Sequence, residues 1–257
     1  KSDTSRKDNR ICFVWLDPAT QKLWVMETYQ WGYFYEGRYY LCIHSPRNKM
    51  PHPCYFTRKG KFIYLATERG LVKLDEATGH WSFISQTRDM EARFVAADPQ
   101  YPVCWFSTYG HGFGAYLPEK DSVIFFPQDA ARYLSSTHAL IEDSSRNCWL
   151  PTNKGLFRVQ KSLLLHFIDH PGSRDILHYD YFDRQEGLMT NEFNGGAQPI
   201  FTRWKDELLL STINGILRFS PGSIPGNNLS DPFFIDYAET PDHKFIKPPV
   251  NGVWEFD

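Results

Sequence analysis

The sequence has little of what would mark a membrane protein or a nucleic-acid-binding protein. No apolar run reaches the length of about 18 residues that a membrane-spanning helix needs, and Lys1–Arg10 lacks the apolar centre of a signal peptide. The 28 basic and 30 acidic residues give a formal net charge of −2, so no field of one sign attracts nucleic acid or an anionic bilayer. We therefore expect this chain to contact neither nucleic acid nor a membrane.

Cysteine is scarce and odd in number, which argues against a complete disulfide framework. Of the 5 cysteines, Cys104 and Cys148 stand directly before Trp105 and Trp149, at the same place in two repeated segments. A small apolar side chain would fit this place equally well. We interpret both cysteines as buried hydrophobes and not as disulfide or metal partners.

Aromatic residues and turn residues are abundant. Phe, Tyr and Trp make up 16% of the chain, and 17 Gly and 17 Pro separate its apolar segments. Aromatic side chains favour the half-buried surface of a strand, and Gly and Pro favour the turns between strands. The composition therefore predicts an all-β protein with many short strands.

A repeat of about 40 residues organises most of the chain. In its best-defined part, a Thr, two turn residues and a Gly separate two apolar segments, as in Thr67–Gly70, Thr152–Gly155 and Thr212–Gly215. Two further copies, Thr28–Gly32 and Thr108–Gly112, carry one extra residue. A polar pair before a glycine that can take a positive φ is typical of a β-hairpin turn. We interpret the threonines as structural, with hydroxyls bonded to the turn backbone.

Each hairpin has a further predicted strand on either side. Segments such as Val14–Leu16, Val95–Ala97 and Leu140–Glu142 precede a hairpin, and His80–Ile84 follows one after a polar turn. Four short strands in every repeat are typical of a β-propeller blade. The sequence thus predicts a β-propeller of four-stranded blades with five recognisable repeats, as a closed or an incomplete ring. Helical periodicity is not evident, and even Leu163–His170 is predicted as a strand.

The character of the sequence changes after Pro221. We predict the blades in residues 1–221, a turn-rich linker in residues 222–231, and the first strands of a truncated second domain in residues 232–257.

The repeats resemble the two-component-regulator propeller repeat, found in the extracellular sensor regions of hybrid two-component systems, chiefly of gut Bacteroidetes. Asp143–Val159 is the best single copy. Tyr179–Gly196, with its Gly-Leu-x-x-Asn-Glu-Phe-Asn motif, resembles the link between the closing blades. The first copy departs from the pattern, because Gly32-Tyr33 stands where the family has Gly-Leu. Asp231–Ile235 resembles the start of the immunoglobulin-like β-sandwich with three tyrosines that follows the propeller in that family.

The resemblance implies a sensor. It implies a periplasmic or extracellular domain that binds a small ligand such as a glycan-derived oligosaccharide and needs no cofactor. Kinase activity would lie elsewhere in a membrane-anchored receptor, which could form a homodimer. Two other classes remain as alternatives: a propeller lyase or hydrolase acting on polysaccharide, and a surface scaffold or secretion component. Because no nucleophile elbow, phosphate loop or zinc-protease motif occurs, we predict no catalytic residue.

Turn residues at equivalent places in the repeats are the candidate ligand contacts, because equivalent turns of a propeller meet on one face. Flat aromatic rings stack on sugar rings, which singles out Trp31 in a predicted turn. Ordinary solvated turns use the same polar residue types. The full set of candidates is Trp31, Arg69, Tyr109, His111, Asn153, Lys154, Asn191, Glu192, Asn194 and Asn214.

A metal site is not predicted. His166 and His170 stand four residues apart and share a face of a strand or of a helix. No third ligand stands at a convincing spacing.

Overall fold

The computed structural model describes residues 11–17, 20–27, 30–44, 50–196 and 198–225, together with residues 238–239 and 245–246. The chain divides into two compact units, residues 1–224 and residues 225–257. The second unit includes the two-stranded sheet of β20 (Ala238–Glu239) and β21 (Phe245–Ile246). Most of the segment predicted to begin a second domain lies outside the described residues.

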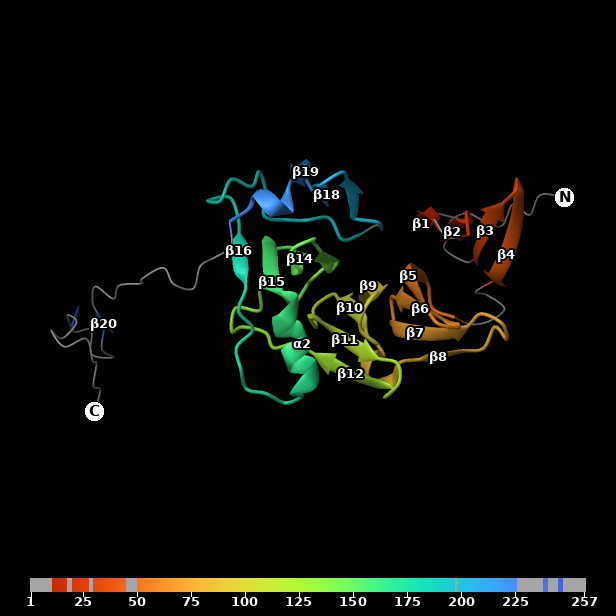
Figure 1. The fold of residues 1–257 in the computed structure, drawn as a ribbon, viewed down its shortest axis with the longest axis horizontal. Coiled ribbons are helices and arrows are strands. Elements are labelled where there is room, and N and C mark those ends of the chain that lie inside the picture. The colour runs from red at the N-terminus through yellow and green to blue at the C-terminus, as the bar shows by residue number, and fades with distance from the viewer. Residues whose placement is uncertain are drawn as a thin grey trace. The chain divides into compact units, whose positions relative to one another are not determined.

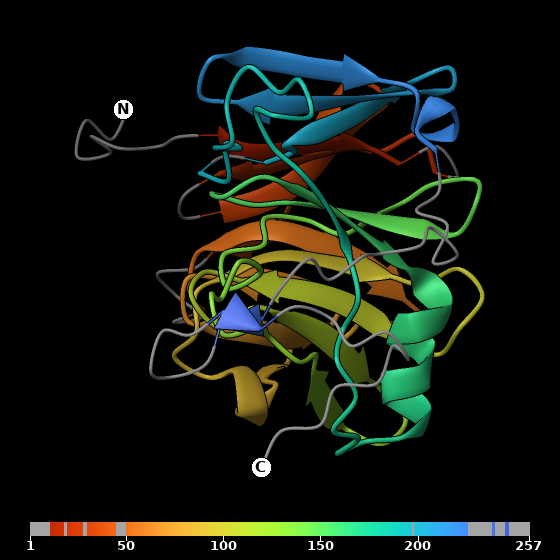
Figure 2. The same ribbon diagram turned by 90° about the vertical axis from the view of Figure 1, so that its left-hand side faces the viewer.

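Five antiparallel sheets follow one another in the first unit, which confirms the predicted β-propeller (Figure 1). Each sheet is one blade, with its strands paired in chain order; blades 1 to 4 have four strands, and blade 5 has three described strands. Figure 2 shows the same blades stacked face to face. The strands are β1 (Ile11–Leu16), β2 (Leu23–Glu27), β3 (Gln30–Tyr35) and β4 (Arg38–His44) in blade 1; β5 (Pro53–Lys59), β6 (Phe62–Thr67), β7 (Gly70–Asp75) and β8 (Trp81–Phe83) in blade 2; β9 (Ala92–Ala97), β10 (Cys104–Thr108), β11 (Phe113–Leu117) and β12 (Ser122–Phe125) in blade 3; β13 (Ile141–Glu142), β14 (Asn147–Pro151), β15 (Leu156–Gln160) and β16 (Asp180–Phe182) in blade 4; and β17 (Phe201–Trp204), β18 (Glu207–Thr212) and β19 (Gly215–Phe219) in blade 5.

The first strands of the blades meet at the hub of the propeller. The ring centre of Tyr55 in β5 lies 4.8 Å from that of Phe13 in β1 and 4.8 Å from that of Phe94 in β9. Phe94 lies 6.4 Å from Phe201 in β17. We call the region around these four rings the hub. Because the rings pack at contact distance, the centre of the molecule is a core and not a wide channel.

The repeated threonine closes the same turn in four blades, as predicted. The Oγ1 hydroxyl of Thr67 donates to the carbonyl oxygen of Gly70 at 2.6 Å, and that of Thr152 donates to the carbonyl of Gly155 at 3.0 Å. The corresponding distances in blades 3 and 5 are 2.8 and 3.0 Å. The hydroxyl therefore satisfies a backbone carbonyl of the hairpin turn. Most of the described residues between Thr and Gly are exposed.

Blade 1 departs from this pattern: β2 and β3 form the predicted hairpin, but the prediction that its turn ends at Gly32 is wrong. Gly32 lies inside β3, paired with Val25 of β2 and Leu41 of β4. A Cβ atom at Gly32 would collide with the carbonyl oxygen of Tyr40. The glycine thus permits the close approach of β4 and does not supply a turn with positive φ.

A buried aspartate fixes the turn after the first strand in blades 3 and 4. Asp98 Oδ2 accepts a hydrogen bond from the indole Nε1 of Trp105 at 2.7 Å, and Asp143 Oδ2 accepts one from Trp149 Nε1 at 2.9 Å. The other oxygen of each carboxylate accepts backbone N–H bonds within its own turn. The repeated Asp and Trp therefore form one hydrogen bond with each other, and this bond joins the first turn of the blade to its second strand.

Cys104 and Cys148 are confirmed as small buried hydrophobes. Both are free and fully buried in β10 and β14. Burial raises the pKa of each thiol to about 12. A thiol with such a pKa stays protonated at neutral pH, so neither is poised as a nucleophile or a metal ligand.

The strand predicted for Leu163–His170 is wrong, because the segment forms the helix α2 (Lys161–Asp169). Leu164 and Phe167 are its buried apolar residues, and Phe167 lies 6.3 Å, ring to ring, from Phe126. A short apolar run has no periodicity that separates a buried strand from a buried helix. In the part of the chain that the structure describes, no helix has the length and apolar character to cross a membrane.

A buried ion triad joins blades 3 and 4. Nζ of Lys161 lies 2.6 Å from Asp98 Oδ2 and 2.6 Å from Glu142 Oε2. Burial alone would lower the pKa of Lys161, but the two carboxylates outweigh it and raise that pKa. Burial alone would raise the pKa of Asp98, but hydrogen bonds, first of all that from Lys161, lower it. Both groups are therefore held in their charged forms.

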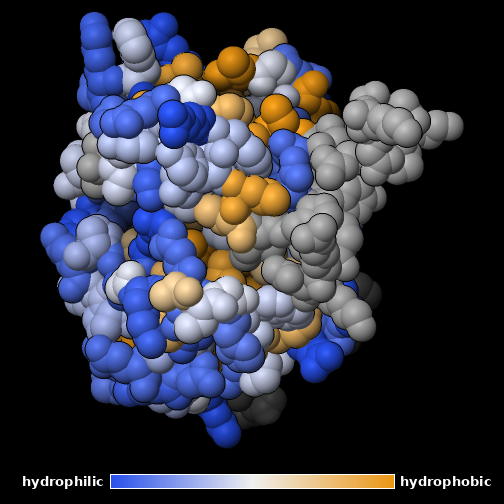
Figure 3. Space-filling model, turned by 90° about the vertical axis from the view of Figure 1, so that its right-hand side faces the viewer, coloured by the Kyte–Doolittle hydropathy of each residue, from blue (hydrophilic) through white to orange (hydrophobic). Residues whose placement is uncertain are grey.

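The two end blades expose apolar surface that the middle blades bury. Every residue of β10 and β11 in blade 3 is buried, whereas β19 in blade 5 has no buried residue and Ile216 is 71% exposed. Figure 3 shows orange apolar side chains on the side where blade 1 lies. In the first unit, no further described sheet follows beyond blade 1 or blade 5. The exposed apolar residues of blade 1 include Ile11, Val14, Leu16, Phe34 and Leu41.

Substitutions at Gly155 and Gly215 measure how closely a fourth strand packs against the third strand of a blade, because blade 4 has a described fourth strand and blade 5 does not. Both have positive φ, +149° and +130°, so a side chain strains either backbone; a Cβ at Gly155 also collides with Tyr181 and Phe182 of β16, whereas Gly215 has open space. We expect Gly155→Ala to lower the free energy of unfolding by about 1–3 kcal/mol more than Gly215→Ala does, because only the former overpacks. Urea denaturation measures both, and equal losses would contradict this account.

Lys161 tests the buried triad. Lys161→Met leaves the buried carboxylate of Asp98 without its cation, whereas Glu142 keeps Arg146, whose Nη1 lies 2.8 Å from Glu142 Oε1. We expect a loss of about 3–5 kcal/mol in the free energy of unfolding at neutral pH. The wild type loses the contribution of Asp98 as pH falls through its lowered pKa, while protonation relieves the buried carboxylate of Asp98 in the variant. The deficit should therefore shrink in acid. Urea denaturation at several pH values checks this, with the exposed Lys61→Met as control; a deficit independent of pH would refute it.

Candidate functional site

The segment between β16 and β17, residues 183–200, runs from blade 4 to the hub. The backbone N–H of Phe193 donates to the carbonyl of Thr152 in blade 4 at 3.0 Å. Two residues later the carbonyl of Gly195 accepts a bond from Nη1 of Arg93, in the first strand of blade 3, at 3.1 Å. We call these residues the crossing segment, because they tie blade 4, which they follow in the sequence, to blade 3, which they do not. The asparagine-rich part of the segment lies beside the hairpin turns.

His138 is buried beside this segment. Its side chain is 2% exposed, and Nε2 lies 2.7 Å from Oδ1 of Asn153. Gly195 packs so closely on the ring that a Cβ there would collide with Nδ1. Burial lowers the pKa of His138, against the opposing effect of Asn153, so the ring is neutral at neutral pH. It is an interior group that holds Asn153 and Gly195 in place.

Tyr109, Glu91 and Arg93 form a cluster on the face where the hairpin turns lie. The backbone N–H of Tyr109 donates to the carbonyl of Glu91 at 2.8 Å. Nη2 of Arg93 lies 2.8 Å from Oε1 of Glu91, and the guanidinium carbon lies 5.1 Å from the centre of the Tyr109 ring. Tyr109 is 45% exposed. A guanidinium thus lies over the ring of a tyrosine that is partly open to solvent.

Three of the predicted ligand contacts come to this region. Tyr109 belongs to the cluster, and Asn153 follows the hairpin threonine of blade 4 and bonds to His138. Asn191 lies in the crossing segment, and its Oδ1 is buried without a hydrogen-bond partner among the described residues. Of the three, Tyr109 is the exposed one.

Two other candidates, Glu192 and Asn194, lie in the crossing segment and are exposed. The carbonyl of Glu192 accepts the backbone N–H of Ile213 in the last hairpin turn at 3.2 Å. Oδ1 of Asn194 accepts the backbone N–H of Gly196 at 3.1 Å. Asn194 therefore shapes the loop, a role that needs no ligand.

Of the remaining polar candidates, Arg69 and Lys154 bond to other protein groups, His111 lies in the same turn as Tyr109, and Asn214 lies on blade 5. Nη2 of Arg69 is 3.1 Å from Oδ1 of Asp89. Nζ of Lys154 donates to a backbone carbonyl at 2.9 Å. His111 is exposed in the turn of blade 3, and Asn214 lines a separate cavity on blade 5.

The prediction of an exposed Trp31 in a turn is wrong. Trp31 lies in β3 opposite Met26 and is 1% exposed. Its ring centre is 5.4 Å from that of Trp24 and 5.5 Å from that of Phe56. Because the second strand of this hairpin already begins at Gln30, the residue falls in a strand, where alternate side chains enter the core. Trp31 is therefore a core residue that no ligand reaches.

Sequence reasoning missed Glu91, Arg93 and His138. Arg93 stands between two buried residues, Ala92 and Phe94, at the start of a first strand. A charged residue inside an otherwise apolar first strand could have indicated that Arg93 has a specific partner. No sequence pattern points to His138, because its partners come from another hairpin, at Asn153, and from the crossing segment, at Gly195.

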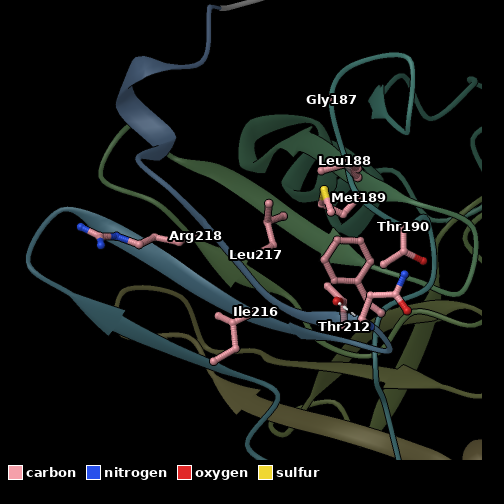
Figure 4. Close-up of a pocket in the computed structure, with 10 residues that line it drawn as sticks. Gly187, Leu188, Met189, Thr190, Thr212, Ile216, Leu217 and Arg218 are labelled. Carbon is pink, nitrogen blue, oxygen red and sulfur yellow. Dashed lines mark hydrogen bonds between the residues drawn. The ribbon is translucent and has the colours of Figure 1, made fainter.

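A cavity of about 330 Å³ lies on blade 5 (Figure 4), between Ile216–Arg218 of β19 and the segment Gly187–Thr190. Figure 4 shows Ile216 and Leu217 on opposite sides of the strand, so the cavity follows the strand's edge. The equivalent residues of blade 4, Leu156–Arg158, pair at that edge with the fourth strand, β16. The cavity thus occupies the place of a fourth strand, and the three-stranded blade explains it.

The two histidines considered as metal ligands stand at the end of α2. Their ring centres are 4.6 Å apart, and Nε2 of His166 lies 2.9 Å from Oδ2 of Asp175. No group of three or more side chains that could hold a metal occurs in the described ranges of the chain.

Comparison with known sequences gives one relative. No protein-family model matches the chain. The chain is similar to "Histidine kinase P4" of Formosa agariphila, with 27% identity over 121 residues, which is 47% of this chain and 8% of the kinase.

Solved structures share the fold. The chain is similar to the extracellular domain of the hybrid two component system BT4673 of B. thetaiotaomicron, with a TM-score of 0.61, 15% identity, and coverage of 88% of this chain and 28% of that chain. The chain is also similar to the extracellular domain of the hybrid two component system BT3049 of B. thetaiotaomicron, with a TM-score of 0.56 and 18% identity. This match covers 92% of this chain and 38% of that chain. The chain thus spans less than two fifths of these structures. These two structures share the fold of this chain, and both are extracellular domains of hybrid two-component systems, the kind that the resemblance of the repeats predicts.

Proposed function

We propose that this chain is the ligand-sensing propeller of an extracytoplasmic receptor, a hybrid two-component sensor, and that its ligand is a glycan-derived oligosaccharide. The observation that carries the proposal is the likeness of 88% and 92% of the chain to extracellular domains of two such systems. The similarity of 121 residues to a histidine kinase supports the same assignment.

The face that carries the hairpin turns favours binding over catalysis. A propeller lyase or hydrolase would need a histidine, tyrosine or carboxylate that reaches a substrate with its pKa matched to proton transfer. His138 is neutral but closed off by Asn153 and Gly195. Glu91 is paired with Arg93, with Oε1 of Glu91 2.8 Å from Nη2 of Arg93. These groups suit hydrogen bonding to a ligand better than acid–base chemistry.

The exit of the chain from the propeller offers a route for the signal. Nε of Arg158 lies 2.7 Å from Oδ2 of Asp180, within blade 4. Nη1 of the same residue donates at 3.1 Å to the carbonyl of Ile224, just past the short 3-10 helix η2 (Pro221–Ser223). A ligand that shifts blade 4 would therefore pull on the start of the second unit, and in the full receptor on whatever follows it.

Ligand binding is tested by a thermal-shift screen of this chain against neutral and acidic plant and host oligosaccharides. A ligand at about a hundred times its Kd stabilises the folded state by about 2.7 kcal/mol, so we expect at least one oligosaccharide to raise the melting temperature. Mass spectrometry should recover it uncut, with the matching monosaccharides as controls. A cleaved product would replace the sensor proposal with the enzyme alternative, and no shift with any of them would oppose ligand sensing by these blades.

A further inference from the structure

We infer that Tyr109 is the stacking platform for a neutral sugar ring, with Glu91 as the acceptor for that sugar's hydroxyl groups. The inference rests on the proposed function, since it names the class of ligand and the residues that would hold it.

One side of the Tyr109 ring is covered by the guanidinium of Arg93. The guanidinium of Arg93 lies 5.1 Å from the ring centre, and the residue is nonetheless 45% exposed. Since the guanidinium occupies one side, we assign the exposed area to the opposite side and to the hydroxyl edge. A sugar ring presents an apolar C–H face that suits such a flat surface, and Tyr offers contact area at little cost in conformational entropy.

The backbone that carries Tyr109 is held on both sides. Its N–H donates to the carbonyl of Glu91 at 2.8 Å, and an isolated β-bridge joins the residue to Ser136. The N–H of Gly112, at the end of the same turn, donates to the carbonyl of Ser135 at 2.8 Å. The platform is thus ordered before any ligand arrives, so that binding spends little free energy on ordering it.

The charges around Tyr109 favour a neutral ligand. Two arginines near the ring are engaged: Nη1 and Nη2 of Arg93 by the carbonyl of Gly195 and by Glu91, and Nη2 of Arg132 by the carbonyl of Gly110 at 2.7 Å. A sulfate or carboxylate approaching Arg93 would meet the carboxylate of Glu91 beside it. Like charges so placed reject an acidic glycan.

The same carboxylate suits a neutral sugar. A sugar that lies flat on an aromatic ring directs its equatorial hydroxyl groups outward from the edge, and these groups donate. Glu91 is partly exposed beside the ring, and its second oxygen, Oε2, adjoins the one bonded to Arg93. Hydrogen bonds to a charged acceptor are stronger than neutral ones.

Calorimetric titration tests the inference with named probes. The neutral set is cellohexaose, xylohexaose, mannohexaose and laminarihexaose, and the acidic set is hexagalacturonate and a heparin hexasaccharide. We expect a neutral probe to bind the chain and Tyr109→Ala to weaken it at least about tenfold, the loss of one aromatic stacking contact. Tyr109→Phe, which keeps the ring, should retain most of the affinity. Trp204→Ala, which removes another exposed ring, should leave the affinity unchanged.

The outcomes separate the two proposals. If a neutral probe binds equally well to wild type and to Tyr109→Ala, the platform is refuted and ligand sensing stands. If only the acidic probes bind, the neutral-sugar inference is overturned and sensing again stands. If no probe of either set binds, both are contradicted. Because Tyr109 is exposed, the alanine variant should fold, and an unchanged circular dichroism spectrum and melting temperature verify that.

Discussion

The structure depends on one constraint: a blade of four strands has two apolar faces and cannot bury either of them alone. In blade 3 every residue of β10 and β11 is buried, which is possible only because blades 2 and 4 cover its two sides. At the hub the contact is aromatic, with ring centres of Tyr55 and Phe94 4.8 Å apart. Where a neighbour is absent among the described residues, as beyond blades 1 and 5, apolar side chains such as Ile216 lie in water. The stability of each blade is therefore a property of its neighbours.

Polar groups fix how neighbouring blades are placed, because apolar faces alone could slide. The turn at Asp98 is the junction of three blades. Its carboxylate receives Lys161 of blade 4 at 2.6 Å, and its carbonyl receives Nζ of Lys59 of blade 2 at 2.9 Å. A buried lysine without its carboxylates would cost several kcal/mol, so only one alignment of these blades satisfies the charges.

This frame determines what the turns can do. Since the threonine hydroxyls satisfy the hairpin backbone, the residues between Thr and Gly are free to face outward. The crossing segment then brings Gly195 onto His138 and binds Arg93, so that Tyr109 stands on an ordered base. The sensor function that we propose uses this order: a rigid face recognises a ligand, and the exit held by Arg158 passes on the change.

The sequence by itself determined the fold class and the hairpins of blades 2 to 5, because these follow from local alternation and from turn residues that recur about every 40 residues. It also determined the roles of the threonines and of Cys104 and Cys148. Only the tertiary structure decided that Trp31 is core, that α2 is a helix, and that Arg93 lies under Tyr109. The bond between Arg93 and Gly195 spans 102 residues of sequence. Contacts of that kind arise from the stacking of blades, and no local pattern encodes them.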